Sequence, residues 1–268
     1  MRVVVKIGGS LMKAGVPEPL VNDAAKLSSS NQLVLVHGGG DVVTDYATRL
    51  GKEQRFVVSP DGIRSRYTDR ETAEIYQMVM SGFLAKRLVQ ALYRAGVKGV
   101  SLVGGDGSLI TATRKSKLVI IDERGRKVAI EGGYTGRVRG VDPSLLDLLI
   151  GQGYVPVVSP VALGEEGEPL NIDGDRAAAS VAMGAEADAV VFATNVDGLS
   201  LDGSLVGHLS AEEAAASLPK IGFGMQKKVM AAVDAVRAGV KEAVICSGTR
   251  DAPLTRAISH ERCTVITP

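Results

Sequence analysis

VVVKIGGS at residues 3–10 is an apolar run that one cation, Lys6, interrupts and two glycines end. An apolar run leading into a glycine turn is typical of a parallel strand that is buried on both faces of an α/β domain. A lysine in such a strand is costly to desolvate unless an anion meets it. We therefore expect Lys6 to face an anion; the alternative is an edge strand from which the ammonium group reaches solvent.

Composition narrows the classes of protein. The 31 Lys and Arg nearly cancel the 30 Asp and Glu, so net charge gives no reason to propose a nucleic-acid or membrane partner. No stretch approaches the roughly 20 apolar residues of a membrane span, and the start shows no signal-peptide pattern. Cys246 and Cys263 lack CxxC spacing and indicate neither a disulfide framework nor a zinc site. We expect a cytoplasmic enzyme.

Short Val/Ile/Leu runs alternate with amphipathic helical segments, which predicts an α/β fold with a mainly parallel sheet covered on both faces. A hairpin is expected between residues 118 and 132, around the turn at 122–125. Asp142 and Pro143 predict an N-cap and a first helical position, for a helix that runs to about residue 151. Two lobes are expected to divide near residues 160–175. The expected strands are 3–7, 33–36, 100–103, 155–159, 189–194, 243–246 and 263–266.

A second glycine site, HGGGD at 37–41, lies between the strand 33–36 and the helical segment 42–50. Glycines let the backbone approach a ligand and point N–H groups at an anion, and the helix N-terminus adds partial positive charge. A tight turn without a ligand is the alternative. The dinucleotide fingerprint is broken at Val43, and no P-loop motif occurs, so nucleotide phosphates need another scheme.

Two further segments carry charge. GFGMQKK at 222–228 opens a helix with two lysines in its first turn, where cations oppose the helix dipole unless a polyanion binds there. Two solvated surface lysines are the alternative. PLNIDGD at 169–175 precedes a helix expected at 176–183. Its two carboxylates fit a metal site, a helix cap at Asp175, or a carboxylate that holds two ammonium groups.

Together these motifs resemble the amino-acid kinase superfamily, over essentially the whole chain. The chain is most similar to the N-acetylglutamate kinase group, and within it to the kinases that act on aminoadipate or glutamate attached to the carrier protein LysW. That closer similarity rests on GIRSRYTD at 62–69, where acetylglutamate kinases have the shorter GLRVTD, and on GGYTGR at 132–137. The motifs of the superfamily are VVKIGGS at 4–10, HGGG at 37–40, NIDGD at 171–175, TNVDGL at 194–199 and GMQKK at 224–228.

The resemblance implies a three-layer αβα sandwich, with residues 1–268 as one amino-acid kinase domain. The N-terminal lobe, about 1–170, would bind the acceptor and form a homodimer, and the C-terminal lobe, about 171–268, would bind the nucleotide. It implies that Lys6 and Lys228 stabilise the transferring phosphoryl group and that Asp175 organises both lysines. Asp173 stands where the family has an asparagine, and its role is left open.

The remaining roles are also implied by the resemblance. Gly39 and Gly40 would contact the substrate, Asn171 its amide, and Arg66 its α-carboxylate, with Arg64 as the alternative because of the two-residue insertion. Arg64, Tyr134 and Arg137 would dock the carrier. The nucleotide-binding residues would be Gly8, Gly9, Ser10, Thr194, Asp197, Gly224 and Met225.

The implied reaction transfers the γ-phosphoryl group of ATP, with Mg²⁺ held through the nucleotide phosphates, to a side-chain carboxylate. A carboxylate is already nucleophilic, so catalysis reduces to alignment and charge neutralisation. Loss of Lys6 is expected to lower turnover by about 10² to 10³ with less effect on binding, and loss of Arg66 to do the opposite. The acyl-phosphate product of lysine or arginine biosynthesis would pass to a reductase. Free N-acetylglutamate as acceptor, a non-catalytic sensor and a nucleotide-binding oxidoreductase are the alternatives.

The segment 114–139 has a local excess of positive charge, with eight basic residues against three acidic ones. LysW carriers are acidic, so a basic rim would steer docking and make it sensitive to salt. A solvated hairpin is the alternative. The basic residues are Arg114, Lys115, Lys117, Arg124, Arg126, Lys127, Arg137 and Arg139.

Overall fold

The computed structural model describes residues 1–268, except for the side chain of Phe223. An eight-stranded sheet forms its centre, in the order β16-β18-β17-β13-β1-β2-β10-β5. Neighbouring strands are parallel except for β17 and β18. All seven strands expected from the sequence form within one residue of their expected ends. The strands of this sheet are β1 (Arg2–Ile7), β2 (Gln32–His37), β5 (Gly99–Val103), β10 (Val155–Ser159), β13 (Ala189–Thr194), β16 (His208–Ser210), β17 (Glu242–Ser247) and β18 (Thr264–Thr267).

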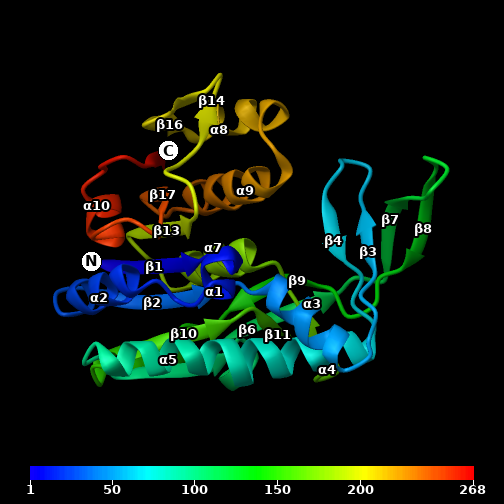
Figure 1. Cartoon of the computed structure of the whole chain (residues 1–268), viewed down its shortest axis with the longest axis horizontal. Coiled ribbons are helices and arrows are strands. Elements are labelled where there is room, and N and C mark those ends of the chain that lie inside the picture. Colours follow the sequence, from blue (N-terminus) through cyan, green and yellow to red (C-terminus); the bar gives the residue numbers. More distant parts are fainter.

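Helices cover both faces of the sheet (Figure 1), which confirms the three-layer αβα prediction. Alternate residues of β1 enter the two cores: Val4 packs in one, Val3 and Val5 in the other, and all three are fully buried. Burial on both faces explains the unbroken apolar run. The α-helices are α1 (Gly9–Lys13), α2 (Glu18–Ser28), α3 (Gly40–Arg49), α4 (Arg70–Gln77), α5 (Ala85–Arg94), α6 (Ser144–Gly151), α7 (Gly174–Gly184), α8 (Ala211–Ser217), α9 (Phe223–Arg237) and α10 (Pro253–Ile258). A π-helix, η1 (Met78–Leu84), joins α4 to α5, and short 3₁₀ turns are η2 (Asp106–Ser108) and η3 (Leu218–Lys220).

Strands from residues 1–170 form one half of the sheet and strands from residues 171–268 the other, with β1 and β13 adjacent at the middle. In Figure 1 the later half, yellow to red, accordingly lies on one side of β1. The roles expected for the two lobes stay predictions. Among the described residues, no helix combines the length and the apolar character that a bilayer crossing requires.

Two helix starts differ from expectation. The helix α6 begins at Ser144, with Pro143 as its N-cap rather than its first residue, although Asp142 still accepts a hydrogen bond from the Ser144 N–H at 3.0 Å. The helix α7 begins at Gly174, and its N-cap is Asp173, whose carboxylate accepts from the N–H groups of the second and third helical residues, Asp175 and Arg176. The alternative that Asp175 caps this helix is therefore wrong, because Asp173 occupies that position.

The hairpin expected between residues 118 and 132 is present as β7 (Lys117–Ile121) and β8 (Lys127–Glu131). A second hairpin, β3 (Phe56–Val58) with β4 (Arg64–Arg66), was not expected. β3 contacts β7, and both hairpins project from the same side of the molecule (Figure 1). The other strands are β6 (Ile110–Arg114), β9 (Gly136–Val141), β11 (Val161–Leu163) and β12 (Pro169–Asn171) in a four-stranded sheet, and the pair β14 (Ser200–Leu201) and β15 (Ser204–Leu205).

Candidate active site

Four adjacent parallel strands, β13, β1, β2 and β10, end along one edge of the sheet. In open α/β sheets, ligands bind at this carboxyl edge. The loops that follow the strands are joined there: the Gly8 N–H donates to the Ala193 carbonyl at 2.9 Å, and the Gly38 N–H donates to the Ile7 carbonyl at 2.9 Å. Both glycine motifs of the sequence therefore meet at the edge where a ligand is expected.

Close packing explains two of these glycines. A Cβ atom on Gly9 would lie 3.1 Å from the Gly39 backbone nitrogen, and one on Gly39 would lie 2.1 Å from Leu84 Cδ1. Side chains are thus excluded where the two loops cross. The contacts that Gly8, Gly9, Ser10, Gly39 and Gly40 would make with ligands stay predictions.

Lys6, Asp175 and Lys228 meet at this edge. Lys6 Nζ lies 2.8 Å from Asp175 Oδ1, and Lys228 Nζ lies 3.1 Å from Asp175 Oδ2. The exposed fractions of the three side chains are 6%, 6% and 14%. The expectation that Lys6 faces an anion is confirmed, and the edge-strand alternative is wrong because β1 lies between β2 and β13.

The apolar face of the helix α9 explains why Lys228 lies at this edge. Val229, Ala232, Val233 and Val236 of α9 are buried against the sheet, as their helical spacing predicts. Packing of that face directs Lys228, in the first turn, toward Asp175. Lys228 is therefore not a solvated surface lysine.

Burial acts to raise the pKa of Asp175, but the charges of Lys6 and Lys228 outweigh it and hold this pKa below 3.8, its ordinary value. Burial, with the charge of Lys6, lowers the pKa of Lys228 below 10.5 although Asp175 opposes the shift. Both pKa values are lowered, which favours the charged form of Asp175, because it faces two cations, and disfavours the charged form of Lys228, which is buried beside the like charge of Lys6. Asp175 thus stays ionised, and two closely held cations face the strand ends, which is an arrangement suited to an anionic ligand.

Asp173 and Lys227 form a second pair beside the first. Lys227 Nζ lies 3.5 Å from Asp173 Oδ2 and donates a hydrogen bond to the Arg64 carbonyl at 3.3 Å. The side chains of Lys227 and Asp173 are 30% and 32% exposed. Sequence reasoning gave Lys227 no partner and left the role of Asp173 open.

His37, the first residue of HGGG, is completely buried. Its Nδ1 lies 3.1 Å from the Gly38 carbonyl oxygen, which only accepts, so Nδ1 carries the proton and Nε2 accepts from the Ser159 hydroxyl at 3.0 Å. Burial lowers the pKa of His37 to about 4, against the Gly38 hydrogen bond and with help from the Lys6 charge. His37 is therefore neutral near pH 7 and links the ends of β2 and β10.

The arginines of GIRSRYTD lie in different surroundings. Arg66 donates to the Gly40 carbonyl at 2.6 Å and to Thr44 Oγ1 at 2.9 Å, and it also bonds Gln54. The Arg64 guanidinium stacks over the Phe56 ring at 3.9 Å and is exposed. Arg66 thus lies against the HGGG loop, whereas Arg64 points to the surface of the hairpin β3–β4.

Two other residues expected to serve acceptor or carrier, Asn171 and Tyr134, contact Thr68, which follows β4. Asn171 Nδ2 donates to Thr68 Oγ1 at 2.9 Å, and its backbone N–H donates to the Tyr134 carbonyl at 2.9 Å. The Tyr134 ring lies under the Arg114 guanidinium at 4.3 Å. Arg137 is exposed on β9.

The predicted basic segment 114–139 is partly neutralised. Three of its arginines pair with carboxylates, at distances of 3.3, 2.8 and 3.1 Å. Burial, and after it the charges of Arg176 and Arg137, lower the pKa of Lys115, whereas the charge of Asp173 acts to raise it. The paired side chains are Arg114 with Glu131, Arg126 with Asp122, and Arg139 with Glu165.

In the expected nucleotide loop, Asp197 is anchored by a residue that sequence reasoning missed. The Arg250 guanidinium binds both Asp197 oxygens at 2.5 Å, and Arg262 lies 3.6 Å from one of them. Thr194 is buried, and its carbonyl accepts from the Gly248 N–H at 2.7 Å. The loops after β13 and β17 are thereby joined. The expected nucleotide contacts of Thr194, Asp197, Gly224 and Met225 stay predictions; the last two lie in the first turn of α9.

The carboxylates of this edge do not fit direct ligation of a metal. Lysines occupy both Asp175 oxygens, and Asp173 caps α7 and pairs with Lys227. Among the described residues, no group of three His, Cys, Asp or Glu side chains converges as a metal site requires.

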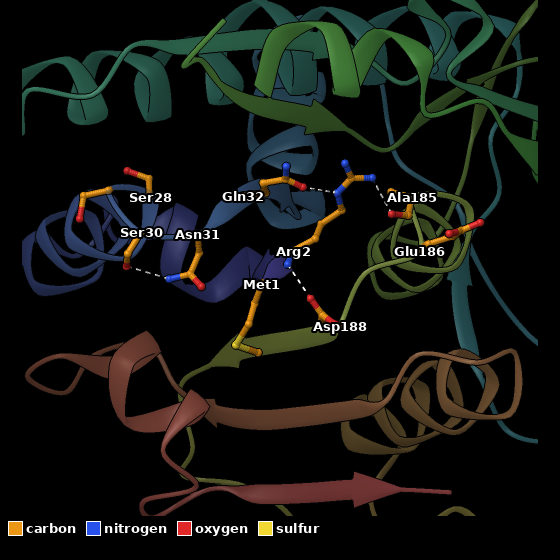
Figure 2. A pocket seen from close by; sticks show the side chains of 10 residues that line it. Met1, Arg2, Ser28, Ser30, Asn31, Gln32, Ala185, Glu186 and Asp188 are labelled. Carbon is orange, nitrogen blue, oxygen red and sulfur yellow. Dashed lines mark hydrogen bonds between the residues drawn. The ribbon is translucent and has the colours of Figure 1, made fainter. Parts of the chain in front are cut away.

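A hollow of about 720 Å³ lies at the opposite, amino end of the strands (Figure 2). Arg2 crosses it and donates to Gln32 Oε1 at 2.9 Å and to the Ala185 carbonyl at 2.7 Å, and its backbone N–H donates to Asp188 at 2.8 Å. Its remaining nitrogen lies 2.7 Å from Asp147 Oδ1. These groups satisfy one another, and the hollow is far from the paired lysines.

Comparison with known proteins gives the class of this chain. Residues 1–247 match the Amino acid kinase family, so the chain belongs to that family, as its motifs predict, and it is a kinase. A Cenarchaeum symbiosum (strain A) protein, provisionally named LysW-aminoadipate/LysW-glutamate kinase, is 54% identical over 264 residues, covering 98% of each chain. A Saccharolobus islandicus (strain Y.N.15.51 / Yellowstone #2) protein of that name is 42% identical over 257 residues, 96% of each.

A solved structure shares the fold. It is N-acetylglutamate synthase from Neisseria gonorrhoeae, complexed with coenzyme A and N-acetyl-glutamate, with a TM-score of 0.81 and 27% identity. The match covers 100% of this chain and 59% of that one.

Proposed function

We propose that this kinase transfers the γ-phosphoryl group of ATP to the side-chain carboxylate of aminoadipate or glutamate carried on LysW. The observation that carries the proposal is the pair of buried lysines held by the two oxygens of Asp175 at the carboxyl edge of the sheet. The names of the relatives at 54% and 42% identity support the carrier-linked acceptor.

The reaction joins an acceptor carboxylate oxygen to the γ-phosphorus and breaks the bond from that phosphorus to the β,γ-bridging oxygen, so that ADP leaves. The acceptor is ionised at neutral pH and loses no proton, so no general base is required. Lys6 and Lys228 would stabilise the charge that spreads over the transferring oxygens. Asp175 would keep the two ammonium groups apart and oriented before ATP binds.

The acceptor would lie between the HGGG loop and the hairpin β3–β4. Arg66, which contacts the Gly40 carbonyl, would exchange one of its present partners for the α-carboxylate, and Asn171 would bind the amide of the acceptor. A docked carrier would meet Arg64, Tyr134 and Arg137. Exposed Phe56, Val119 and Val128 on the two hairpins add apolar contact area for a protein partner.

One experiment separates the acceptors. The enzyme receives ATP with carrier-linked glutamate, carrier-linked aminoadipate or free N-acetylglutamate, and hydroxylamine traps the acyl phosphate as a hydroxamate. We expect turnover on the carrier-linked substrates, and we expect added salt to lower that turnover. Turnover on the free amino acid alone would replace the carrier assignment by N-acetylglutamate kinase, and ATP binding without any turnover would indicate a sensor.

Further parts of the proposal follow from this chemistry. Mg²⁺ would enter with ATP, the acyl phosphate would be consumed by a reductase, and the protein would work in the cytoplasm, where ATP is available. The lobe at residues 1–170 would bind the acceptor and the lobe at 171–268 the nucleotide. Light scattering tests whether the protein forms a homodimer through the first lobe. A monomeric mass would contradict the proposed homodimer.

A further inference from the structure

Adjacent residues of α9 contact carboxylates two residues apart in α7 and its cap. Lys228 pairs with Asp175 in the buried centre, and Lys227 pairs with Asp173 nearer the surface. The outer pair is longer, 3.5 Å against 3.1 Å, and each of its side chains is about a third exposed, at 30% and 32%. An ion pair of this exposure contributes little to stability. Its contribution is therefore better explained by the segments that it holds in place.

Lys227 also reaches the other half of the chain. Its ammonium group donates to the carbonyl of Arg64, the first residue of β4, at 3.3 Å. The last residue of β4, Arg66, is bound to the Gly40 carbonyl at 2.6 Å. The short strand β4 is thus attached at one end to α9 and at the other to the HGGG loop.

We propose that Lys227 and Asp173 are a positioning pair that holds the hairpin β3–β4 against α9, so that the acceptor faces the phosphoryl group between Lys6 and Lys228. The inference deepens the proposed function and rests on it. Asp173 orients the Lys227 ammonium toward the Arg64 carbonyl while it caps α7 with its other oxygen. Neither residue touches the reacting atoms; both act through the hairpin.

The chain offers a clean substitution. Asp173→Asn provides an amide oxygen that can still cap α7, but it removes the charge that Lys227 faces. Lys227→Gln removes the cation and leaves the cap intact, and Lys227→Arg keeps the charge. Arg237→Gln is the matched control, because Arg237 forms an exposed pair with Glu212, at 3.7 Å, at the far end of α9.

The test measures kcat and KM for the carrier-linked acceptor and for ATP. We expect Lys227→Gln and Asp173→Asn each to raise the acceptor KM by about tenfold, with the double variant no worse than either, because the two residues act as one unit. The KM for ATP should stay within about twofold, Lys227→Arg should restore most of the acceptor KM, and Arg237→Gln should match wild type. Thermal unfolding temperatures check that each variant is folded. If Asp173→Asn does not fold, the KM values of Lys227→Gln alone decide the test.

Additive effects of the two substitutions, an equal rise in the KM for ATP, or an unchanged acceptor KM would overturn the positioning role. If wild type turns over only a free amino acid, the carrier assignment fails separately, and the same variants test the pair on that acceptor. If no acceptor is turned over, the proposed function fails and the positioning role falls with it.

Discussion

Lys6 Nζ lies 2.8 Å from Asp175 Oδ1, and each side chain is only 6% exposed. Burying two opposite charges is costly, and such a pair adds little net stability compared with apolar side chains of similar volume. Lys228, 3.1 Å from the other oxygen of Asp175, adds a second cation to the same enclosed space. This concentration of charge is readily explained by a function that needs two fixed ammonium groups.

The lowered pKa of Lys228 leads us to expect that activity falls at alkaline pH. Its pKa is lowered from 10.5 by burial and by Lys6, and its cation is lost as pH rises through the folded value. We expect kcat/KM for ATP, which reports the free enzyme, to fall with rising pH below 10.5. Lys228→Arg, whose cation does not titrate in this range, should lack that fall at a lower absolute rate. An identical alkaline limb in wild type and Lys228→Arg would assign it to another group.

The lowered pKa of His37 leads us to expect that the folded protein loses stability at acid pH. Its folded pKa, about 4, lies below the ordinary 6.5, so the unfolded chain binds the proton first as pH falls. The free energy of unfolding should therefore lose about 3 kcal/mol between pH 7 and 4 through this buried group. Urea unfolding of wild type and His37→Gln over this range measures the difference. Equal pH slopes for the two proteins would show that His37 does not titrate as described.

Loss of Arg250 is expected to weaken binding at the proposed nucleotide site. Its bidentate pair with Asp197 joins the loops after β13 and β17. We expect Arg250→Met to raise the KM for ATP by about five- to tenfold, with a smaller change in kcat, because the loop loses its charge-assisted anchor. Arg262→Met is the control, since Arg262 lies farther from Asp197, at 3.6 Å, and should change the KM little. A larger effect at Arg262 would reverse the assignment.

Much of the sheet could be predicted because burial on both faces leaves a continuous apolar run, as in Val3–Val5. Lys6 was identifiable for the same reason, since it violates that pattern. Its partners were not derivable from spacing, because nothing local indicates that residues 6, 175 and 228 approach; their expected association came from the family resemblance. The geometry confirms that association, while the ligand contacts stay predictions.

Other features leave no local signal. Arg250 is one arginine in a loop, and its significance depends on Asp197 across the fold. The hairpin β3–β4 has strands of only three residues, too short for an alternating pattern to stand out. Asp173 and Asp175 could not be told apart as caps, because either carboxylate satisfies the same preference at the helix start.

The most direct test of the central claim is the turnover of Lys6→Met, which keeps the apolar stem of the side chain and removes its charge. Acyl-phosphate formation is measured as hydroxamate with saturating ATP and acceptor, on protein whose folding is checked by circular dichroism. We predict that kcat falls by about 10² to 10³ while KM for ATP changes much less. A folded Lys6→Met protein with a kcat close to wild type would remove Lys6 from the chemistry and contradict the two-lysine mechanism.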